Sequence, residues 1–196
     1  MLNDSFDPIA NLASITAIFL TGLVVKTMDD FLDEENPLES GVFAYLGRSS
    51  YVYGLFTLLI ASALDFSVTF SLFSACYILG MFTSSTMKLP SGLTGWVESL
   101  IVLFTCIYIT GFLVTLWSLL IIISIQLLDD WMDYHTDLLH HATNYVRLLG
   151  REPAILLFFL TLYSSVLLQP FLSVTVFCAA LIISEGVFTC ISYPSR

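Results

Sequence analysis

Residues 112–133, FLVTLWSLLIIISIQLLDDWMD, form an apolar run that ends in a compact acidic motif. A second copy of this pattern lies 100 positions earlier, where an apolar stretch is followed by DDFLD at residues 29–33. Together with the neighbouring Glu34, Glu35 and Asp137, the two motifs hold nine of the sixteen acidic residues. Carboxylates beside a membrane span are unfavourable unless something compensates them. The pattern therefore predicts a helical membrane protein with a functional site at the ends of two spans.

The composition excludes an ordinary soluble domain and a nucleic-acid-binding protein. The chain has 196 residues, of which 57% are hydrophobic and 11% charged, and its mean hydropathy is +0.89. These values are typical of a polytopic membrane protein. Only six residues are Lys or Arg, which leaves no basic surface for nucleic acid. The four cysteines lie within apolar runs without metal-ligand spacing, which indicates small buried side chains.

Hydropathy predicts seven transmembrane helices, namely one single span at residues 11–28 and three longer segments that each hold two. The longer segments are 51–83, 95–129 and 154–190, and each exceeds one crossing of about 20 residues. Polar or turn-forming residues interrupt them at Asp65-Phe66-Ser67, Thr110-Gly111 and Gln169-Pro170. We expect a helical hairpin in each segment, with Asp65 capping the first turn.

The basic residues predict an orientation for this all-α bundle. With seven spans, all six of them fall on one side of the membrane: Lys26, Arg48, Lys88, Arg147, Arg151 and Arg196. Short loops rich in Lys and Arg stay in the cytoplasm. We therefore expect the N-terminus outside, with both acidic motifs and the C-terminus on the cytoplasmic side.

The 100-residue spacing predicts an internal repeat within a single transmembrane domain, 1–196. In each half a span ends in Asp-Asp-aromatic-apolar-Asp, a loop follows, and a helical hairpin comes next. The halves run roughly over 11–83 and 112–190, with 95–110 as a linking helix. Because both halves enter and leave on the same sides, the repeat is parallel and its axis follows the membrane normal. Such a repeat would face the two motifs toward each other across a central cavity.

Helical spacing groups the carboxylates of each motif. Asp29 and Asp33 share one face of a helix, as do Asp129, Asp133 and Asp137. Carboxylates at this spacing repel one another unless they are neutralised, and Mg²⁺ is a hard cation that prefers carboxylate and phosphate oxygens. We therefore predict that these five residues bind Mg²⁺. The metal would bind a diphosphate and neutralise the negative charge that develops on this leaving group.

The nearby basic residues fit the same chemistry. Lys88, Arg147 and Arg151 lie in the loops nearest the motifs, where they would hold the outer phosphate oxygens. Lys26 lies one turn before Asp29, and two roles stay open for it: extending to the membrane interface or contacting phosphate.

The two motifs resemble those of the UbiA superfamily of intramembrane prenyltransferases. That family carries Asp-rich motifs, commonly Asn-Asp-x-x-Asp-x-x-x-Asp and Asp-x-x-x-Asp, at the cytoplasmic ends of two helices. The second motif here, from Asp129 to Asp137, satisfies both patterns. The first has Asp29 in place of Asn and Pro37 in place of the last Asp, so that one of the two glutamates after Asp33 is its alternative third ligand.

The resemblance extends over nearly the whole chain. Tyr77 and Lys88, which precede a Pro/Gly stretch, are similar to the family's Tyr and Lys between its fourth and fifth helices. The chain would be a compact member that lacks the family's first and last helices. The open flank left by their absence favours a homo-oligomer.

The resemblance implies a Mg²⁺-dependent transfer of an isoprenoid from its diphosphate to a lipid or aromatic acceptor through an allylic carbocation. Substrate contacts would come from Lys26, Tyr77, Lys88, Arg147 and Arg151, and the catalytic groups would be Asp30, Asp130 and Lys88. A terpene cyclase or lyase of the same superfamily is one alternative, and a non-catalytic scaffold is another if Pro37 disables the first motif. A divalent-cation transporter is a third, although transporter sites lie near the bilayer midplane rather than at helix ends.

Overall fold

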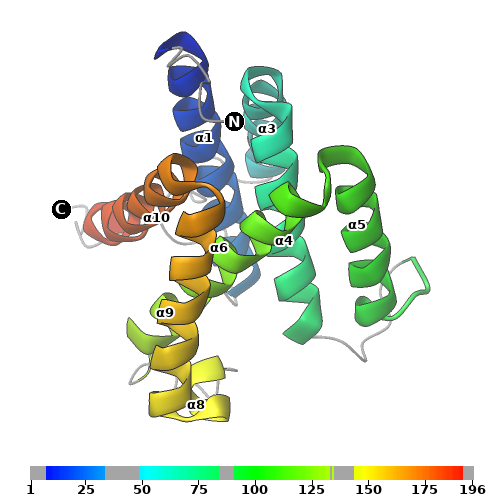
Figure 1. The fold of residues 1–196 in the computed structure, drawn as a ribbon. Coiled ribbons are helices and arrows are strands. Elements are labelled where there is room, and N and C mark those ends of the chain that lie inside the picture. Colours follow the sequence, from blue (N-terminus) through cyan, green and yellow to red (C-terminus); the bar gives the residue numbers. More distant parts are fainter. Residues whose placement is uncertain (1–7, 34–48, 84–90, 133, 135–143, 192–196) are drawn as a thin grey trace, which may run out of the picture. The chain divides into compact units, whose positions relative to one another are not determined.

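The protein is helical, as the sequence predicts. A computed structural model describes residues 8–33, 49–83, 91–132, 134 and 144–191, and of these it gives only the backbone of 8, 29–33, 50–51, 82–83 and 185–191. In chain order the helices of this described part (Figure 1) are α1 (Pro8–Asp33), α3 (Ser50–Leu64), α4 (Phe66–Thr83), α5 (Gly95–Thr110), α6 (Phe112–Met132), α8 (Tyr145–Leu149), α9 (Arg151–Leu168) and α10 (Pro170–Ile191).

Single residues separate consecutive helices at several places. Asp65, Gly111 and Gln169 lie at the three breaks predicted from the sequence, and Gly150 separates α8 from α9. At each break the residue's N–H donates to the carbonyl four residues before it, and its own carbonyl accepts from the N–H four residues after it, at 2.9–3.1 Å. The helical hydrogen-bond ladder therefore continues on both sides of each break.

One such break makes a corner rather than the expected hairpin. Antiparallel helix hairpins use connections of about two to five residues, whereas only Gly111 lies between α5 and α6. These two helices meet at a corner and then diverge (Figure 1). A one-residue link is too short to turn the chain back alongside itself.

Asp65 caps α4, which confirms the prediction for this residue. Its Oδ1 accepts a hydrogen bond from the N–H of Val68 at 3.1 Å, and the Ser14 hydroxyl donates to its Oδ2 at 2.6 Å. The first N–H groups of a helix have no partner within the helix, so a side-chain acceptor stabilises the start of α4. The bond from Ser14 ties the same carboxylate to α1.

Gly111 holds a backbone conformation that only glycine adopts without strain, because its φ is 91° and its ψ is 157°. We expect Gly111→Ala to lower the free energy of unfolding by about 1–3 kcal/mol, measured by denaturant titration in detergent micelles. The matched control is Gly54, which lies inside α3 with open space where a Cβ would stand. Gly54→Ala should be neutral or stabilise by about 0.5–1 kcal/mol, and equal losses at both positions would contradict the assignment.

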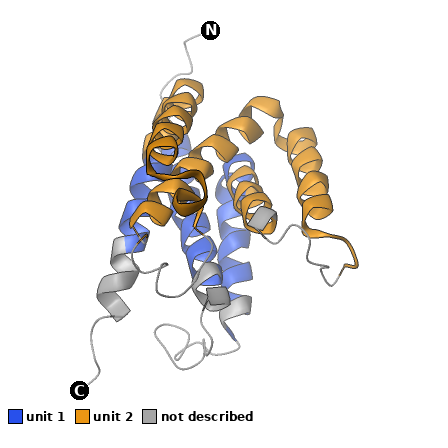
Figure 2. Cartoon of the chain, turned by 90° about the horizontal axis from the view of Figure 1, so that it is seen from below, with its two compact units in different colours: residues 1–69, 175–196 blue, residues 70–174 orange. Residues whose placement is uncertain are grey.

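The chain divides into two compact units, each described here by itself (Figure 2). Unit 1 comprises residues 1–69 and 175–196, and within it α1 packs against α3. Unit 2 comprises residues 70–174, and within it α6 packs against α9, with contacts from α5 and α8. In each unit, the helix that carries an acidic motif at its end therefore packs against a helix that follows the motif. The pairs are α1 with α3 and α6 with α9.

The buried positions of α1 and α6 recur at the same spacing as the acidic motifs. Four buried residues on α1 have buried counterparts 100 positions later on α6. The α1 residues are Ala17, Ile18, Thr21 and Val24, and their counterparts on α6 are Trp117, Ser118, Ile121 and Ser124. These positions form one helical face in each case.

The helices after two of the breaks each place a buried hydroxyl against a helix that carries an acidic motif, at Thr69 and at Ser173. In unit 1 the hydroxyl of Thr21 on α1 lies 3.5 Å from that of Thr69. In unit 2 the indole N–H of Trp117 on α6 donates to the Ser173 hydroxyl at 2.8 Å. Both hydroxyls are buried, so each needs such a partner.

Within the described residues, three helical segments are long and apolar enough to cross a membrane, namely Ile9–Met28, Phe112–Met132 and Arg151–Leu168. Four further apolar segments have 10–17 residues, which at about 1.5 Å per residue is short of a hydrocarbon core of about 30 Å: Val52–Leu64, Phe66–Met81, Gly95–Thr110 and Pro170–Ser184. Large side chains such as Phe104 and Tyr108 on α5 are 66% and 91% exposed. Outward apolar surfaces of this kind suit contact with lipid.

Candidate functional site

The second acidic motif begins in the last turn of α6, in unit 2. Asp129 is half-buried, whereas Asp130 is only 7% exposed. The next residue, Trp131, is 46% exposed. Successive helical residues point in directions that differ by about 100°, so the two neighbouring carboxylates face different surroundings.

Asp130 accepts two hydrogen bonds from residues at the start of α8, one at its side chain and one at its backbone carbonyl. The backbone N–H of Tyr145 donates to Asp130 Oδ2 at 2.6 Å, and Asn144 Nδ2 donates to the backbone carbonyl of Asp130 at 2.7 Å. Asn144 also caps α8, because its Oδ1 accepts from the N–H of Arg147 at 3.1 Å. We refer to these contacts of Asp130 and Asn144 as the α6–α8 clasp.

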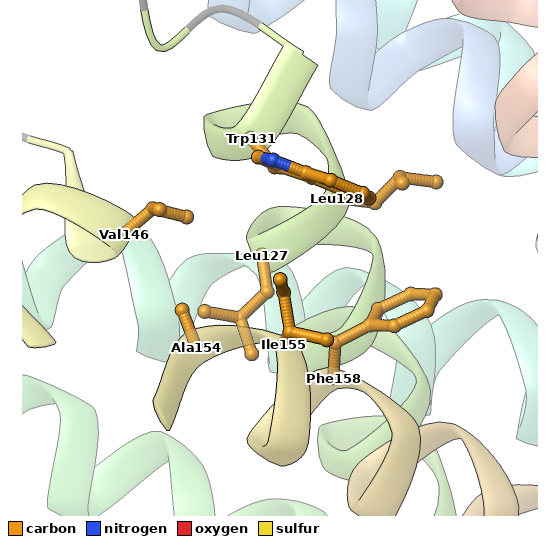
Figure 3. Close-up of a pocket in the computed structure, with 7 residues that line it drawn as sticks. All are labelled: Leu127, Leu128, Trp131, Val146, Ala154, Ile155 and Phe158. Carbon is orange, nitrogen blue, oxygen red and sulfur yellow. The ribbon is translucent and has the colours of Figure 1, made fainter. Parts of the chain in front are cut away.

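Apolar side chains from α6, α8 and α9 pack beneath the clasp. Leu127, Val146 and Ala154 form a buried cluster, with Tyr134 and Phe158 among the side chains packed against it. Figure 3 shows a shallow pocket beside this cluster, lined by Leu127, Leu128, Trp131, Val146, Ala154, Ile155 and Phe158. The pocket is partly open to solvent, and its enclosed part is far smaller than a small-molecule site.

Two of the predicted phosphate-binding residues lie close to the second motif. Arg147 is exposed in the last turn of α8, and Arg151 is exposed at the start of α9. The guanidinium carbon of Arg151 lies 5.1 Å from the ring centroid of Tyr134, a distance typical of a cation–π contact. The short helix α8 therefore positions Arg147, and the start of α9, which packs against α6 and is linked to α8 by Gly150, positions Arg151.

The pKa of the Tyr145 phenol is affected by its burial and by the neighbouring Asp130. Burial raises the pKa of Tyr145, and the negative charge of Asp130 raises it further. Both effects disfavour the phenolate, because it would be a charge in an apolar setting beside a carboxylate. Tyr145 is therefore a neutral hydroxyl at physiological pH.

Tyr77 contacts a carboxylate that the sequence analysis did not single out. Its hydroxyl donates to Glu98 Oε2, and the Ser91 hydroxyl donates to Glu98 Oε1. Glu98 lies in the first turn of α5, where a negative charge is favourable. The signal for it was available in the sequence, because Glu98 is the one acidic residue between Asp65 and Asp129. Its partner Tyr77, 21 positions away, could be found only from the fold.

The other predicted residues are placed as follows. Asp29, Asp30 and Asp33 belong to the last two turns of α1 in unit 1, but their side chains lie outside the described residues, as do Lys88, Asp133 and Asp137 altogether. Lys26 is half-buried in α1. The first motif belongs to unit 1 and the second to unit 2. The predicted central cavity between the two motifs stays a prediction.

The Mg²⁺ site also stays a prediction. Among the residues with described side chains, no three His, Cys, Asp or Glu groups lie together in a way that could hold a metal ion. Of the five predicted ligands, Asp129 is the one whose side chain is described. The predicted ligand set consists entirely of carboxylates, and this donor chemistry suits Mg²⁺.

No protein-family model matches the chain, and neither curated proteins nor solved structures show significant similarity to it.

Proposed function

We propose that this protein is an integral-membrane, UbiA-like prenyltransferase that uses Mg²⁺ and an isoprenoid diphosphate. The observation that carries the proposal is the recurrence of one arrangement at a spacing of 100 residues. Both acidic motifs begin in the last turns of long apolar helices, and those helices bury the same four positions. A duplicated carboxylate motif at matched helical positions is expected of a shared ligand site. It is not expected of acidic residues that merely lie in water at the membrane surface.

We also propose a parallel repeat with a cavity between its halves. One feature of the packing supports it: the helix that carries each motif packs against a later helix in its own unit, α1 against α3 and α6 against α9. In this arrangement the motifs and all six basic residues would lie on the cytoplasmic side, with the N-terminus outside.

The bound metal would supply neutralisation of the diphosphate leaving group, held by Asp129, Asp133 and Asp137 together with the carboxylates of the first motif. Arg147 and Arg151 would bind outer phosphate oxygens, since both are exposed beside the second motif. The bond between isoprenoid C1 and the diphosphate oxygen would break, and its electron pair would leave with pyrophosphate. A nucleophilic atom of the acceptor would then bond to C1 and release its proton to water.

The test is incubation of the purified protein in detergent with MgCl₂, isoprenoid diphosphates of short and long chain length, and a membrane lipid extract as the source of the acceptor. Pyrophosphate release should require Mg²⁺ and stop on addition of EDTA, and mass analysis of the organic products should show an acceptor adduct. A rearranged hydrocarbon without an acceptor would indicate the cyclase or lyase alternative instead. Flux of Mg²⁺ or Mn²⁺ into proteoliposomes without pyrophosphate release would overturn the proposal in favour of transport.

A further inference from the structure

The two side chains of the α6–α8 clasp are buried. Asp130 and Asn144 are each 7% exposed. Bonds of 2.6 Å and 2.7 Å join the side chain and the backbone of Asp130 to residues 145 and 144, and a bond of 3.1 Å from the N–H of Arg147 to Asn144 Oδ1 caps α8. A buried carboxylate is unfavourable unless it is paired or hydrogen-bonded, and the N–H of Tyr145 supplies such a bond.

The helix held by the clasp cannot keep its position by itself. α8 has five residues, whereas isolated helices shorter than about 12–15 residues are marginal in water. Its first N–H groups have no partner within the helix, and the clasp provides two of them with side-chain acceptors, Asp130 and Asn144. The position of α8 therefore depends on side chains from outside its own five residues.

Two cations depend on that position. Arg147 lies within α8, and Arg151 follows it after Leu148, Leu149 and the single linking residue Gly150. Any movement of α8 would shift Arg147 directly relative to the end of α6, and it would act on Arg151 through the single linking residue Gly150.

We propose that Asp130 and Asn144 are positioning residues, whose clasp fixes α8 and thereby places Arg147 and Arg151 beside the second acidic motif. This revises the catalytic role that the sequence predicts for Asp130. Asp130 faces α8, whereas its neighbour Asp129 points about 100° away on the same helix and keeps the metal-binding role of the proposed function. The inference about the two arginines rests on the proposed function, whereas the clasp itself can be tested without it.

The structural test is limited trypsin digestion of the full-length protein in detergent micelles, with cleavage of the Arg147–Leu148 bond followed by mass spectrometry. The Arg48–Ser49 bond, in the other unit, serves as the internal reference. Asp130→Ala removes a buried bond to a charged group, and Asn144→Ala removes two bonds, one to the Asp130 carbonyl and one from the Arg147 N–H. Each change raises the opened population of α8 and should speed cleavage after Arg147 by about tenfold or more. Asp130→Asn keeps an acceptor for the Tyr145 N–H and should stay within about threefold of the unmodified protein.

Unchanged cleavage in both alanine variants would overturn the clasp. So would an Asp130→Asn protein that is cleaved as fast as Asp130→Ala. If Asp130→Ala fails to fold, Asn144→Ala and Asp130→Asn still decide the question, because each leaves a different part of the clasp in place.

The activity test separates positioning from catalysis through pyrophosphate release at varied diphosphate concentration. Asp130→Ala and Asn144→Ala should raise KM more than they lower kcat, since the arginines would be displaced. Asp130→Asn should recover most of what Asp130→Ala loses. An Asp130→Asn protein with protected α8 but no turnover would reject the positioning role in favour of a catalytic one. Absence of turnover in the unmodified protein would reject the proposed function, and the trypsin result would still decide the clasp.

Discussion

Replacing Asp133 with alanine should reduce Mg²⁺-dependent pyrophosphate release by about a hundredfold or more. Asp133 is the central carboxylate of the i, i+4, i+8 series Asp129, Asp133 and Asp137. Loss of one metal ligand removes charge stabilisation of several kcal/mol, and every 1.36 kcal/mol corresponds to about tenfold in rate. The measurement is the rate of pyrophosphate release from an isoprenoid diphosphate at saturating Mg²⁺.

The control for this experiment is a carboxylate with a structural assignment. Asp65 caps α4 and accepts from Ser14, and an asparagine there keeps both acceptor positions. Asp65→Asn should retain pyrophosphate release. A higher Mg²⁺ concentration should restore part of the activity of Asp133→Ala, as expected when a ligand and not a proton-transfer group is lost. Full turnover in Asp133→Ala would reject the ligand assignment.

Trp117→Ala should produce the largest loss of stability in the described part of the chain, about 3–5 kcal/mol. The Trp117 side chain is completely buried on α6, so truncation leaves a large cavity. It also removes the N–H donor of the Ser173 hydroxyl, which is buried as well. The measurement is equilibrium unfolding in mixed micelles with increasing SDS, followed by tryptophan fluorescence or far-UV circular dichroism.

The contribution of the hydrogen bond can be separated from that of packing. Trp117→Phe keeps an aromatic ring but removes the donor, and Ser173→Ala removes the acceptor. A double-mutant cycle on these two changes should give a coupling of about 0.6–1.7 kcal/mol, the range of interhelical hydrogen bonds in membrane proteins. A loss below about 1 kcal/mol for Trp117→Ala would show that the cavity collapses without cost and would contradict the packing argument.

Local chemistry explains why the helix breaks could be predicted. Asp65 is a capping residue within an apolar run, Gly111 tolerates a positive φ, and Gln169 precedes a proline. Each property acts on the residue itself or its immediate neighbours. The predicted linking helix at 95–110 coincides with α5 for the same reason. The direction that the chain takes after a break was harder to predict from the sequence. The α5–α6 corner differs from the expected hairpin because a single residue links the two helices.

The candidate site was only partly predictable. Helical periodicity identified the acidic motifs, and charge identified Arg147 and Arg151. The sequence analysis assigned Asp129 to the metal and Asp130 to catalysis, and it did not predict that the fold buries Asp130 against α8 and leaves Asp129 half-buried. The sequence analysis also missed Asn144, whose role depends on a residue 14 positions earlier.

The sequence by itself determined that this chain is helical and apolar enough to cross a membrane, where its helices break, and that one acidic pattern occurs twice. These properties follow from composition and from interactions within a few residues. Only the tertiary structure decided that Asp130 meets the N–H of Tyr145, that Tyr77 meets Glu98, and that Trp117 meets Ser173. Such pairs depend on how separate helices pack, and the free energy of packing is shared among contacts that no single stretch of sequence contains.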